Sequence, residues 1–592
     1  MSRAVKTKEE RALDPVTFAV VRSGLTSAAV DIHWVFKRTC TLPILYEGND
    51  YGAAVYDSRL NAFSESPAAP LFSGALDDCI HRMVAEIGVE NLRPGDVLFT
   101  SDPGLHGCHA PDAPFAEPIF YEDALVGYAA LRCHVGDLAA INFYPTASTS
   151  SYQEGLMVPP IKVYKEGNLN DDLMRIVRAN SRMPIETAGN FMASAAALHA
   201  GRDRVLKVID QYGLGTYFAA VDGMLDHGER IARQRIDEIP DGTYQIEDSI
   251  SDDGVNVGEP IKLACRVTID GSSMTVDTTG SAEQVEGPYN CPFGSTLAAA
   301  RFSLTKLIGA DAASPGQHRT LEVIAPRGSV YNPVIPPAAS WNSYLPQVRL
   351  CAMIANALAP ALPTLVPAPH PADYPLILAM LEDPETRRPS FFAMDTGTGL
   401  GAKKGADGAS ALVNEIGAGV EITPAEVLEV RHPVLRHRLE LVTDSGGPGE
   451  FRGGLGVAVE YEFLGDGVGM CTSDGIKTWG LAGGFGAPGR DEIIMYPGTD
   501  RELRLGKASE LPLSAGDREI SITAGGGGYG DPWRRDVNKV LRDVRNGYVS
   551  RQAAESIYGV VFGLDGEIDQ RATVRRRTEL EATTPGRFAS ES

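Results

Sequence analysis

Ser101-Asp102-Pro103-Gly104-Leu105-His106-Gly107-Cys108-His109-Ala110-Pro111-Asp112 and Leu131-Arg132-Cys133-His134-Val135-Gly136-Asp137 are the two segments around which the chain is organised. Each contains or follows an apolar run typical of a β-strand, residues 96–100 for the first and 125–131 for the second. Paired strands bring their ends together, so we expect His109, Asp112 and His134 to converge on one ion. Two imidazoles and a carboxylate suit Zn, Mn or Fe and leave coordination positions open for water or substrate.

The spacing of these residues also allows a second interpretation. A His-x-x-Asp pair followed by a distant histidine is less specific for metal than HExxH. In a loop rich in glycine and proline, histidines also cap turns or bind the backbone, so a polar loop without metal stays open on spacing alone. Cys108 and Cys133 each precede a candidate ligand, and buried packing is the simpler role for both.

The composition of the chain excludes several classes of protein. At 592 residues it is too long for one hydrophobic core, and its net charge of −23 argues against binding to nucleic acid or to an anionic membrane. The eight cysteines are scattered without CxxC spacing, and this pattern fits reduced thiols better than a set of disulfides. The first residues lack the apolar core of a signal peptide, and no apolar run is long enough to span a bilayer. We therefore expect a cytoplasmic protein with no nucleic-acid or membrane partner.

The sequence predicts a multi-domain α+β fold with mixed sheets, a central helical region and a β- and glycine-rich C-terminal third. The predicted regions are a metal-site α/β region at 1–165, a helical region at 166–240, a mixed β/α region at 241–365, a β- and glycine-rich region at 366–535, and a C-terminal helix with a mobile tail at 536–592. The mobile tail is expected from about Arg571.

Local signals predict several individual elements. Asp14 before Pro15 predicts a capped helix over 14–37, and Gly88 should end a second helix that begins near residue 74. Residues 42–46 and 51–56 have the pattern of strands, and residues 117–134 that of a hairpin turning at 122–123. The proline-rich stretch 363–390 is predicted to be loop.

Two glycine-rich stretches, 444–456 and 523–532, resemble phosphate-binding loops only in composition. Neither is followed by Gly-Lys-Ser/Thr and neither opens a helix, so the P-loop interpretation fails. Tight turns between strands are the default prediction, and an anion-binding nest is the alternative.

Taken together, these stretches resemble the hydantoinase B/oxoprolinase family. That family comprises the B components of ATP-dependent hydantoinases, the matching half of 5-oxoprolinases, caprolactamase, and the metal-bearing subunits of acetone and acetophenone carboxylases. The resemblance runs in the same order from about residue 14 to 564, through residues 50–57, 92–97, 102–112, 152–160, 277–282, 444–456, 479–489 and 525–532.

The resemblance implies roles for individual residues. His109 and Asp112 match the family's His-x-x-Asp metal ligands, and His134 matches the histidine on the next strand. Asp50 matches an acidic residue of the same centre, either as a ligand or as the base that orients or deprotonates water. Asp102 and Glu154 match positions near the site and are candidate catalytic residues.

Two local sequences differ from the hydantoinase-like pattern. Glu47-Gly48-Asn49 stands where basic residues usually precede Asp50, and His134-Val135 stands where two adjacent histidines are common. A single histidine at the second position is similar to the ketone carboxylases. By contrast, residues 152–160 are similar to the hydantoinases.

The resemblance implies the metal-bearing subunit of an ATP-dependent cyclic amidohydrolase. Such an enzyme opens hydantoin, oxoproline or lactam rings after a hydantoinase A-like partner has phosphorylated the carbonyl oxygen, giving N-carbamoyl amino acids or amino acids. The expected cofactors are a divalent ion, Zn or Mn, on this chain and ATP with Mg on the partner, in a heterotetramer with an enclosed passage between the two sites. The alternatives are the corresponding subunit of an ATP-dependent ketone carboxylase and a non-catalytic scaffold.

Overall fold

The computed structural model forms two compact units, Met1–Ile354 and Ala355–Ser592. It describes residues 13–309, 315–334, 336, 338–373, 376–417, 419–475, 477–489, 491–563 and 566–583. Both units contain helices and sheets, so the predicted multi-domain α+β class is confirmed.

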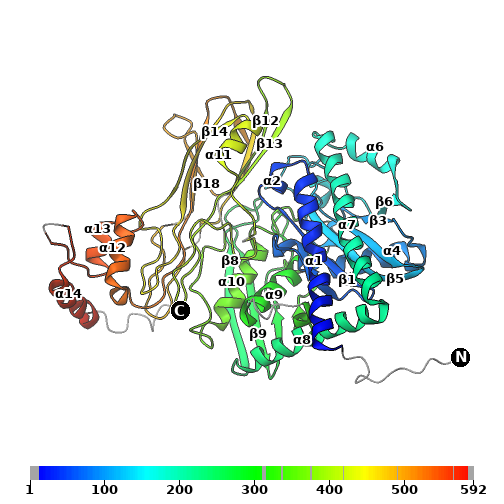
Figure 1. Cartoon of the computed structure of the whole chain (residues 1–592). Coiled ribbons are helices and arrows are strands. Elements are labelled where there is room, and N and C mark those ends of the chain that lie inside the picture. The colour runs from blue at the N-terminus through cyan, green and yellow to red at the C-terminus, as the bar shows by residue number, and fades with distance from the viewer. Residues whose placement is uncertain are drawn as a thin grey trace. The chain divides into compact units, whose positions relative to one another are not determined.

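The first unit is built on a seven-stranded antiparallel sheet in the order β2-β1-β5-β4-β3-β6-β7 (Figure 1). The strands are β1 (Tyr51–Asp57), β2 (Ala62–Glu65), β3 (Val97–Phe99), β4 (Asp112–Tyr121), β5 (Ala124–His134), β6 (Ile161–Lys165) and β7 (Asn168–Leu169). β4 and β5 form the predicted hairpin, and Glu122 takes the left-handed turn conformation with φ of 53°. The central strands β1, β5 and β4 are almost wholly buried.

Helices cover both faces of this sheet. One face packs against α1 (Pro15–Thr39), α7 (Pro184–Tyr212) and α8 (Leu214–Asp237), and the other packs against α4 (Leu76–Ile87). Ala129 and Leu131 of β5 lie in the core with α1 and α7, whereas Tyr128 and Ala130 lie with α4. Because side chains alternate along a strand, His134 is on the α4 face. The region 166–240 therefore shares one core with the sheet of 1–165.

The predicted helix boundaries follow from local capping. Asp14 Oδ1 accepts hydrogen bonds from the backbone N–H groups of Val16 and Thr17 at 3.1 and 3.0 Å, which caps α1. α4 ends at Gly88, whose φ of 89° is accessible to glycine at little cost. Both predicted helices are confirmed.

A smaller sheet completes the first unit, in the order β11-β10-β9-β8. Its strands are β8 (Gly242–Ile250), β9 (Ile261–Asp270), β10 (Ser273–Asp277) and β11 (Leu321–Ile324). α9 (Phe293–Ile308) packs against α3 (Pro70–Ser73), and α10 (Pro346–Leu358) follows later in the chain.

The second unit packs two antiparallel sheets around one core. The first has the order β13-β12-β16-β19 and the second β14-β15-β20-β17-β18. Their strands are β12 (Leu376–Glu382), β13 (Pro389–Asp395), β14 (Val434–Leu441), β15 (Val457–Phe463), β16 (Gly467–Thr472), β17 (Glu492–Met495), β18 (Leu503–Leu505), β19 (Ala508–Leu513) and β20 (Arg518–Ile522). Ile377 and Phe392 from one sheet share this core with Val459 and Ile493 from the other. The helices of the unit are α11 (Ala425–Arg431), α12 (Val537–Arg545), α13 (Arg551–Ser556) and α14 (Gln570–Thr583).

The glycine-rich stretches serve close backbone packing, and the prediction of tight turns is wrong for most of their glycines. Within 525–530 only Gly530 has a positive φ, of 73°. A Cβ on Gly526 would lie 2.1 Å from the carbonyl oxygen of Leu400, and one on Gly453 would lie 1.9 Å from that of Gly526. Gly526 N–H also donates to Gly454 O at 3.0 Å. The glycines are needed because backbones lie side by side with no space for side chains.

Three other local predictions are wrong. Residues 43–46 form α2 (Pro43–Tyr46), begun by a proline at the first helical position, where a strand was expected. The stretch 363–390 contains β12 and the start of β13, because the apolar run Leu376–Glu382 forms a buried strand between the flanking prolines. The tail from Arg571 is helical in α14, which is rich in good helix formers, and residues 584–592 lie outside the described part of the chain.

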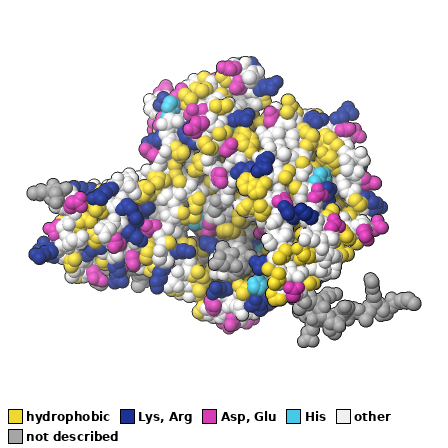
Figure 2. Space-filling view, in the orientation of Figure 1, with side chains coloured by type: hydrophobic (Ala, Val, Ile, Leu, Met, Phe, Trp, Pro, Cys, Tyr) yellow, Lys and Arg dark blue, Asp and Glu magenta, His cyan; other side chains and the backbone are white. Residues whose placement is uncertain are grey.

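Basic and acidic side chains are interspersed over the face drawn in Figure 2. Among the described helices, none has the length and apolar character needed to cross a bilayer.

Glu519 makes the stability of the second unit depend on pH. Its side chain is fully buried in β20, and burial raises its pKa to about 8, while Ser521 donates a hydrogen bond to one of its oxygens. The folded state keeps this proton between about pH 4.5 and 8, where the unfolded state loses it, so stability falls as pH rises through that window.

We expect Glu519→Gln to remove this pH dependence. The loss of stability between pH 5 and pH 8 should shrink by on the order of 4 kcal/mol, and the variant should be the more stable protein at pH 8. Urea unfolding at both pH values measures the difference. Parallel pH profiles for parent and variant would contradict a buried, protonated Glu519.

Candidate metal centre

Three predicted ligands meet at one end of the β4–β5 hairpin. β4 begins at Asp112 and β5 ends at His134, and the two residues are direct partners in the strand register. His109 lies one turn before β4, with its carbonyl oxygen accepting the Asp112 N–H at 3.0 Å. One ligand atom from each of the three residues lies within 4.8 Å of the other two. The geometry brings together the set that the sequence spacing predicted.

The cluster is buried and charged as a cation site requires. His109 Nε2 and His134 Nδ1 each lie 3.0 Å from Asp112 Oδ1, and all three residues are at most 3% exposed. Burial lowers the pKa of His134, which favours neutral imidazole. Burial also acts to raise the pKa of Asp112, but His109 and His134 outweigh it and hold that pKa well below its usual range. A carboxylate beside neutral imidazole nitrogens is the donor set that Zn, Mn or Fe accepts, so the residues fit a divalent cation.

A second layer of side chains fixes the orientation of the ligands. Cys108 Sγ donates to Asp112 Oδ2 at 3.2 Å, and burial raises the pKa of this thiol well above its ordinary value, so it stays protonated. Tyr144 Oη lies 3.0 Å from His109 Nε2, and its ring packs on Trp341 with centroids 4.7 Å apart. The rings of Tyr144 and Trp341 therefore lie on one side of the cluster.

Asp50 lies beside the cluster and is not a member of it. Its carbonyl oxygen accepts the His134 N–H at 3.5 Å, and its side chain is only partly buried. The carboxylate does not belong to the group of ligand atoms that share the 4.8 Å limit. The position is adjacent to the site, and the roles of ligand or base stay predictions.

Asp102 caps a helix. It precedes α5 (Pro103–His106), and its Oδ1 accepts the Gly104 N–H at 2.9 Å. This bond shapes the loop that carries His109. The carboxylate is outside the three-residue cluster, and its predicted catalytic role stays a prediction.

Glu154 holds a loop from a distant part of the first unit. It follows η3 (Ser151–Gln153) and is 1% exposed. Its oxygens accept the backbone N–H groups of Ala339 and Ser340 at 2.8 Å each and the Ser148 hydroxyl at 2.8 Å. Burial raises its pKa although these donors act to lower it. The loop that it anchors carries Trp341, so its contacts are those of a positioning residue.

Sequence reasoning missed Tyr144, Asn342 and Arg132. Asn342 Oδ1 accepts from Ser295 Oγ at 2.8 Å and lies 3.7 Å from Cys108 Sγ, yet it is remote from the histidines in sequence. Arg132 is fully buried and donates to the carbonyl oxygen of His106. Its alternation with His134 along β5 placed it on the same face, which was the one available signal.

Comparison with known proteins identifies the family of the chain. The family model described as hydantoinase B/oxoprolinase matches residues 14–532. The chain is 30% identical over 586 residues to the B component of a putative D-/L-hydantoinase from Pseudomonas sp. strain NS671, covering 95% of this chain and 97% of that protein.

Two solved structures share the fold. The ATP-dependent caprolactamase from Pseudomonas jessenii superposes with a TM-score of 0.84 at 28% identity, over 96% of this chain and all of that one. A nucleotide-free acetone carboxylase superposes with a TM-score of 0.88 at 20% identity, over 99% of this chain and 85% of that one. The second likeness is one of fold alone.

Replacing either histidine should empty the centre. We expect His109→Ala or His134→Ala to lower the metal bound per chain by about tenfold or more, because each removes one of three ligands. Elemental analysis of purified protein by mass spectrometry measures this. His227→Ala, on the exposed surface of α8, is the matched control and should keep its metal. Retention of metal in both ligand variants would contradict the site.

Removing the Glu154 carboxylate should loosen the loop at 339–341. We expect Glu154→Ala to lower the free energy of unfolding by about 3 kcal/mol, because it leaves buried N–H donors without an acceptor. Urea unfolding measures the loss, and metal content should be kept. Unchanged stability with lost turnover would instead support the predicted catalytic role.

Proposed function

The chain belongs to the hydantoinase B/oxoprolinase family, and from that membership we propose that it is the metal-bearing subunit of an ATP-dependent cyclic amidohydrolase. The observation that carries the proposal is the buried cluster of His109, Asp112 and His134. It supplies one carboxylate and two imidazoles at the end of a sheet, in a chain whose relatives include a component of a putative hydantoinase and an ATP-dependent caprolactamase.

The residues of this chain would hold the cation and control the proton. A divalent ion in such a site lowers the pKa of water and polarises carbonyl oxygens. His109, Asp112 and His134 would hold this ion. Cys108 would keep Asp112 oriented through the hydrogen bond that its S–H group donates. Asp50, adjacent and partly exposed, is assigned the role of orienting or deprotonating the attacking water. Tyr144 and Trp341, which pack beside the cluster, would limit the entry of bulk water that could hydrolyse an activated intermediate.

The energy of the reaction would come from a partner subunit. Opening an unstrained amide ring is slow because amide resonance is lost. Phosphorylation of the carbonyl oxygen would make the ring carbon more reactive towards water. The glycine-rich stretches of this chain pack backbone against backbone and lack the sequence of a P-loop. We therefore assign ATP and Mg to a hydantoinase A-like partner, in a heterotetramer, consistent with the naming of the relative as one component of a multi-subunit hydantoinase.

Ketone carboxylation is the competing function. The likeness to acetone carboxylase is one of fold, and the more similar sequences named above are those of a hydantoinase component and a caprolactamase. Cyclic amide hydrolysis is therefore the preferred proposal, and the test includes bicarbonate to separate the two.

Co-expression with a hydantoinase A-like subunit should give an active complex. We expect ATP-dependent opening of at least one ring in a panel of hydantoins, 5-oxoproline and lactams, measured by chromatography of the products. His134→Ala should reduce turnover by about a thousandfold or more, since removing a ligand disables the centre, and His227→Ala should keep it. Turnover of ketones that requires bicarbonate, with no ring opening, would overturn the proposal in favour of a carboxylase.

A further inference from the structure

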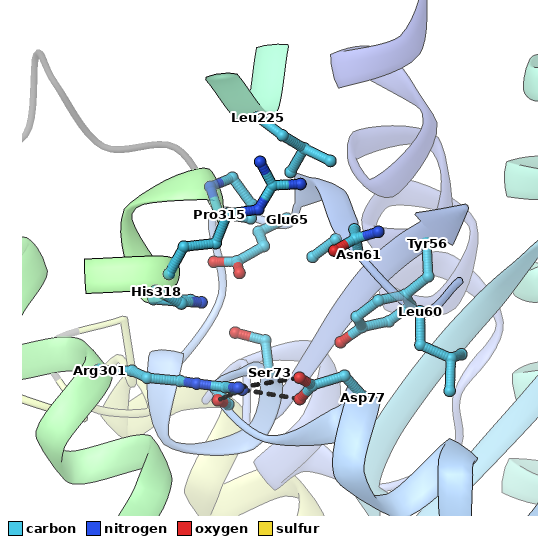
Figure 3. A pocket seen from close by; sticks show the side chains of 13 residues that line it. Tyr56, Leu60, Asn61, Glu65, Ser73, Asp77, Leu225, Arg301, Pro315 and His318 are labelled. Carbon is cyan, nitrogen blue, oxygen red and sulfur yellow. Dashed lines mark hydrogen bonds and ion pairs between the residues drawn. The ribbon is translucent and has the colours of Figure 1, made fainter. Parts of the chain in front are cut away.

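A cavity lies in the first unit, away from the candidate metal centre. Its volume is about 170 Å³. Tyr56 of β1 lines it and packs on the α4 side of the sheet. The metal-site end of β1 is Tyr51, next to Asp50, so at about 3.3 Å per residue Tyr56 lies roughly 16 Å along the strand. The cavity is therefore separate from the candidate metal centre. Figure 3 shows the side chains that line it.

The cationic side chains of the cavity are already paired. Arg301 of α9 binds both oxygens of Asp77 at 2.7 and 2.9 Å and also donates to the carbonyl oxygen of Gly74 at 2.9 Å. Arg319 binds Asp226 at 3.2 Å, on the neighbouring helix. Neither guanidinium is left to balance an anionic ligand.

The remaining acidic group of the cavity is Glu65. Burial, with Arg301 nearby, lowers the pKa of His318 to about 3, so its imidazole is neutral. The carboxylate of Glu65 makes no hydrogen bond or ion pair with any described residue. The Glu65 residue is exposed, so a ligand can reach it from solvent, while partial desolvation of its carboxyl group raises the pKa. Arg301 acts on Glu65 electrostatically, but its N–H groups bind Asp77 and Gly74, so the Glu65 carboxylate has no hydrogen-bonded counter-ion. A cation is therefore the occupant that this carboxylate favours.

Three uncharged oxygen atoms accompany Glu65. Tyr56 is 2% exposed and Ser73 is 6% exposed, and neither hydroxyl has a hydrogen-bond partner among the described residues. Asn61 Nδ2 donates to the two oxygens of Asp57 at 3.2 and 3.1 Å, which leaves Asn61 Oδ1 available. Figure 3 shows the oxygens of Tyr56, Asn61, Ser73 and Glu65 facing the same central space. Oxygen atoms that face a cavity and have no protein partner are available to bind a ligand.

We propose that this cavity binds a small primary ammonium ligand. An ammonium group carries one positive charge and three N–H donors. Glu65 balances the charge, and Asn61 Oδ1, Tyr56 Oη and Ser73 Oγ accept the N–H groups. The volume of about 170 Å³ restricts the ligand to a few non-hydrogen atoms beyond the amine. The proposal does not depend on the chemistry assigned to the metal centre.

Calorimetric titration of the full chain with n-propylammonium chloride tests the proposal. We expect saturable binding of n-propylammonium and none of 1-propanol, which has the same number of heavy atoms and no charge. Glu65→Gln should weaken binding by about tenfold or more, and Tyr56→Phe by about threefold or more, as lost hydrogen bonds to a charged group do. Glu86→Gln, an exposed carboxylate of α4 that does not line the cavity, should bind like the parent.

Several results would overturn this assignment. They are no binding of n-propylammonium, equal binding of 1-propanol, and an unchanged Kd in Glu65→Gln. Displacement of n-propylammonium by an equal concentration of potassium would instead identify a metal-ion site. If Glu65→Gln does not fold, Tyr56→Phe and Ser73→Ala decide, and an unchanged Kd in both contradicts the proposal.

Discussion

The candidate site depends on one carboxylate oxygen, Asp112 Oδ1, that lies 3.0 Å from a nitrogen of His109 and 3.0 Å from a nitrogen of His134. The register of the β4–β5 hairpin makes this possible, because it sets the first residue of one strand opposite the last residue of the other. A slip of one residue would turn His134 to the opposite face of the sheet, into the core with α1 and α7. The packing of that core therefore fixes the site, since Leu131 and Cys133 must stay on the α1–α7 side.

Much of this arrangement follows from local sequence. The capping residue Asp14, the turn at Glu122 and the apolar runs on either side of it specify the first helix and the hairpin, and the hairpin alone suffices to join Asp112 to His134. Contacts made across long sequence separations could not be read this way. Tyr144 and Asn342 reach the cluster through loops whose paths depend on tertiary packing.

The residues predicted from family resemblance make different kinds of contact in the structure. Asp102 and Glu154 use their oxygens to bind backbone N–H groups, one capping a short helix and the other holding a loop 185 residues away. A residue can belong to a family motif because it shapes the site. Its position in the motif therefore does not show whether it takes part in the reaction or supports the structure. The glycine-rich stretches illustrate the same limit, because turns and close backbone packing both require glycine.

The central claim is that His109, Asp112 and His134 hold a single divalent cation. Anomalous diffraction from crystals of the purified chain, recorded on both sides of the Zn and Mn absorption edges, tests it most directly. The account predicts one anomalous peak at about 2.0–2.2 Å from a nitrogen of each histidine and an oxygen of Asp112. A fully loaded protein whose only peak lies elsewhere in the chain would contradict it.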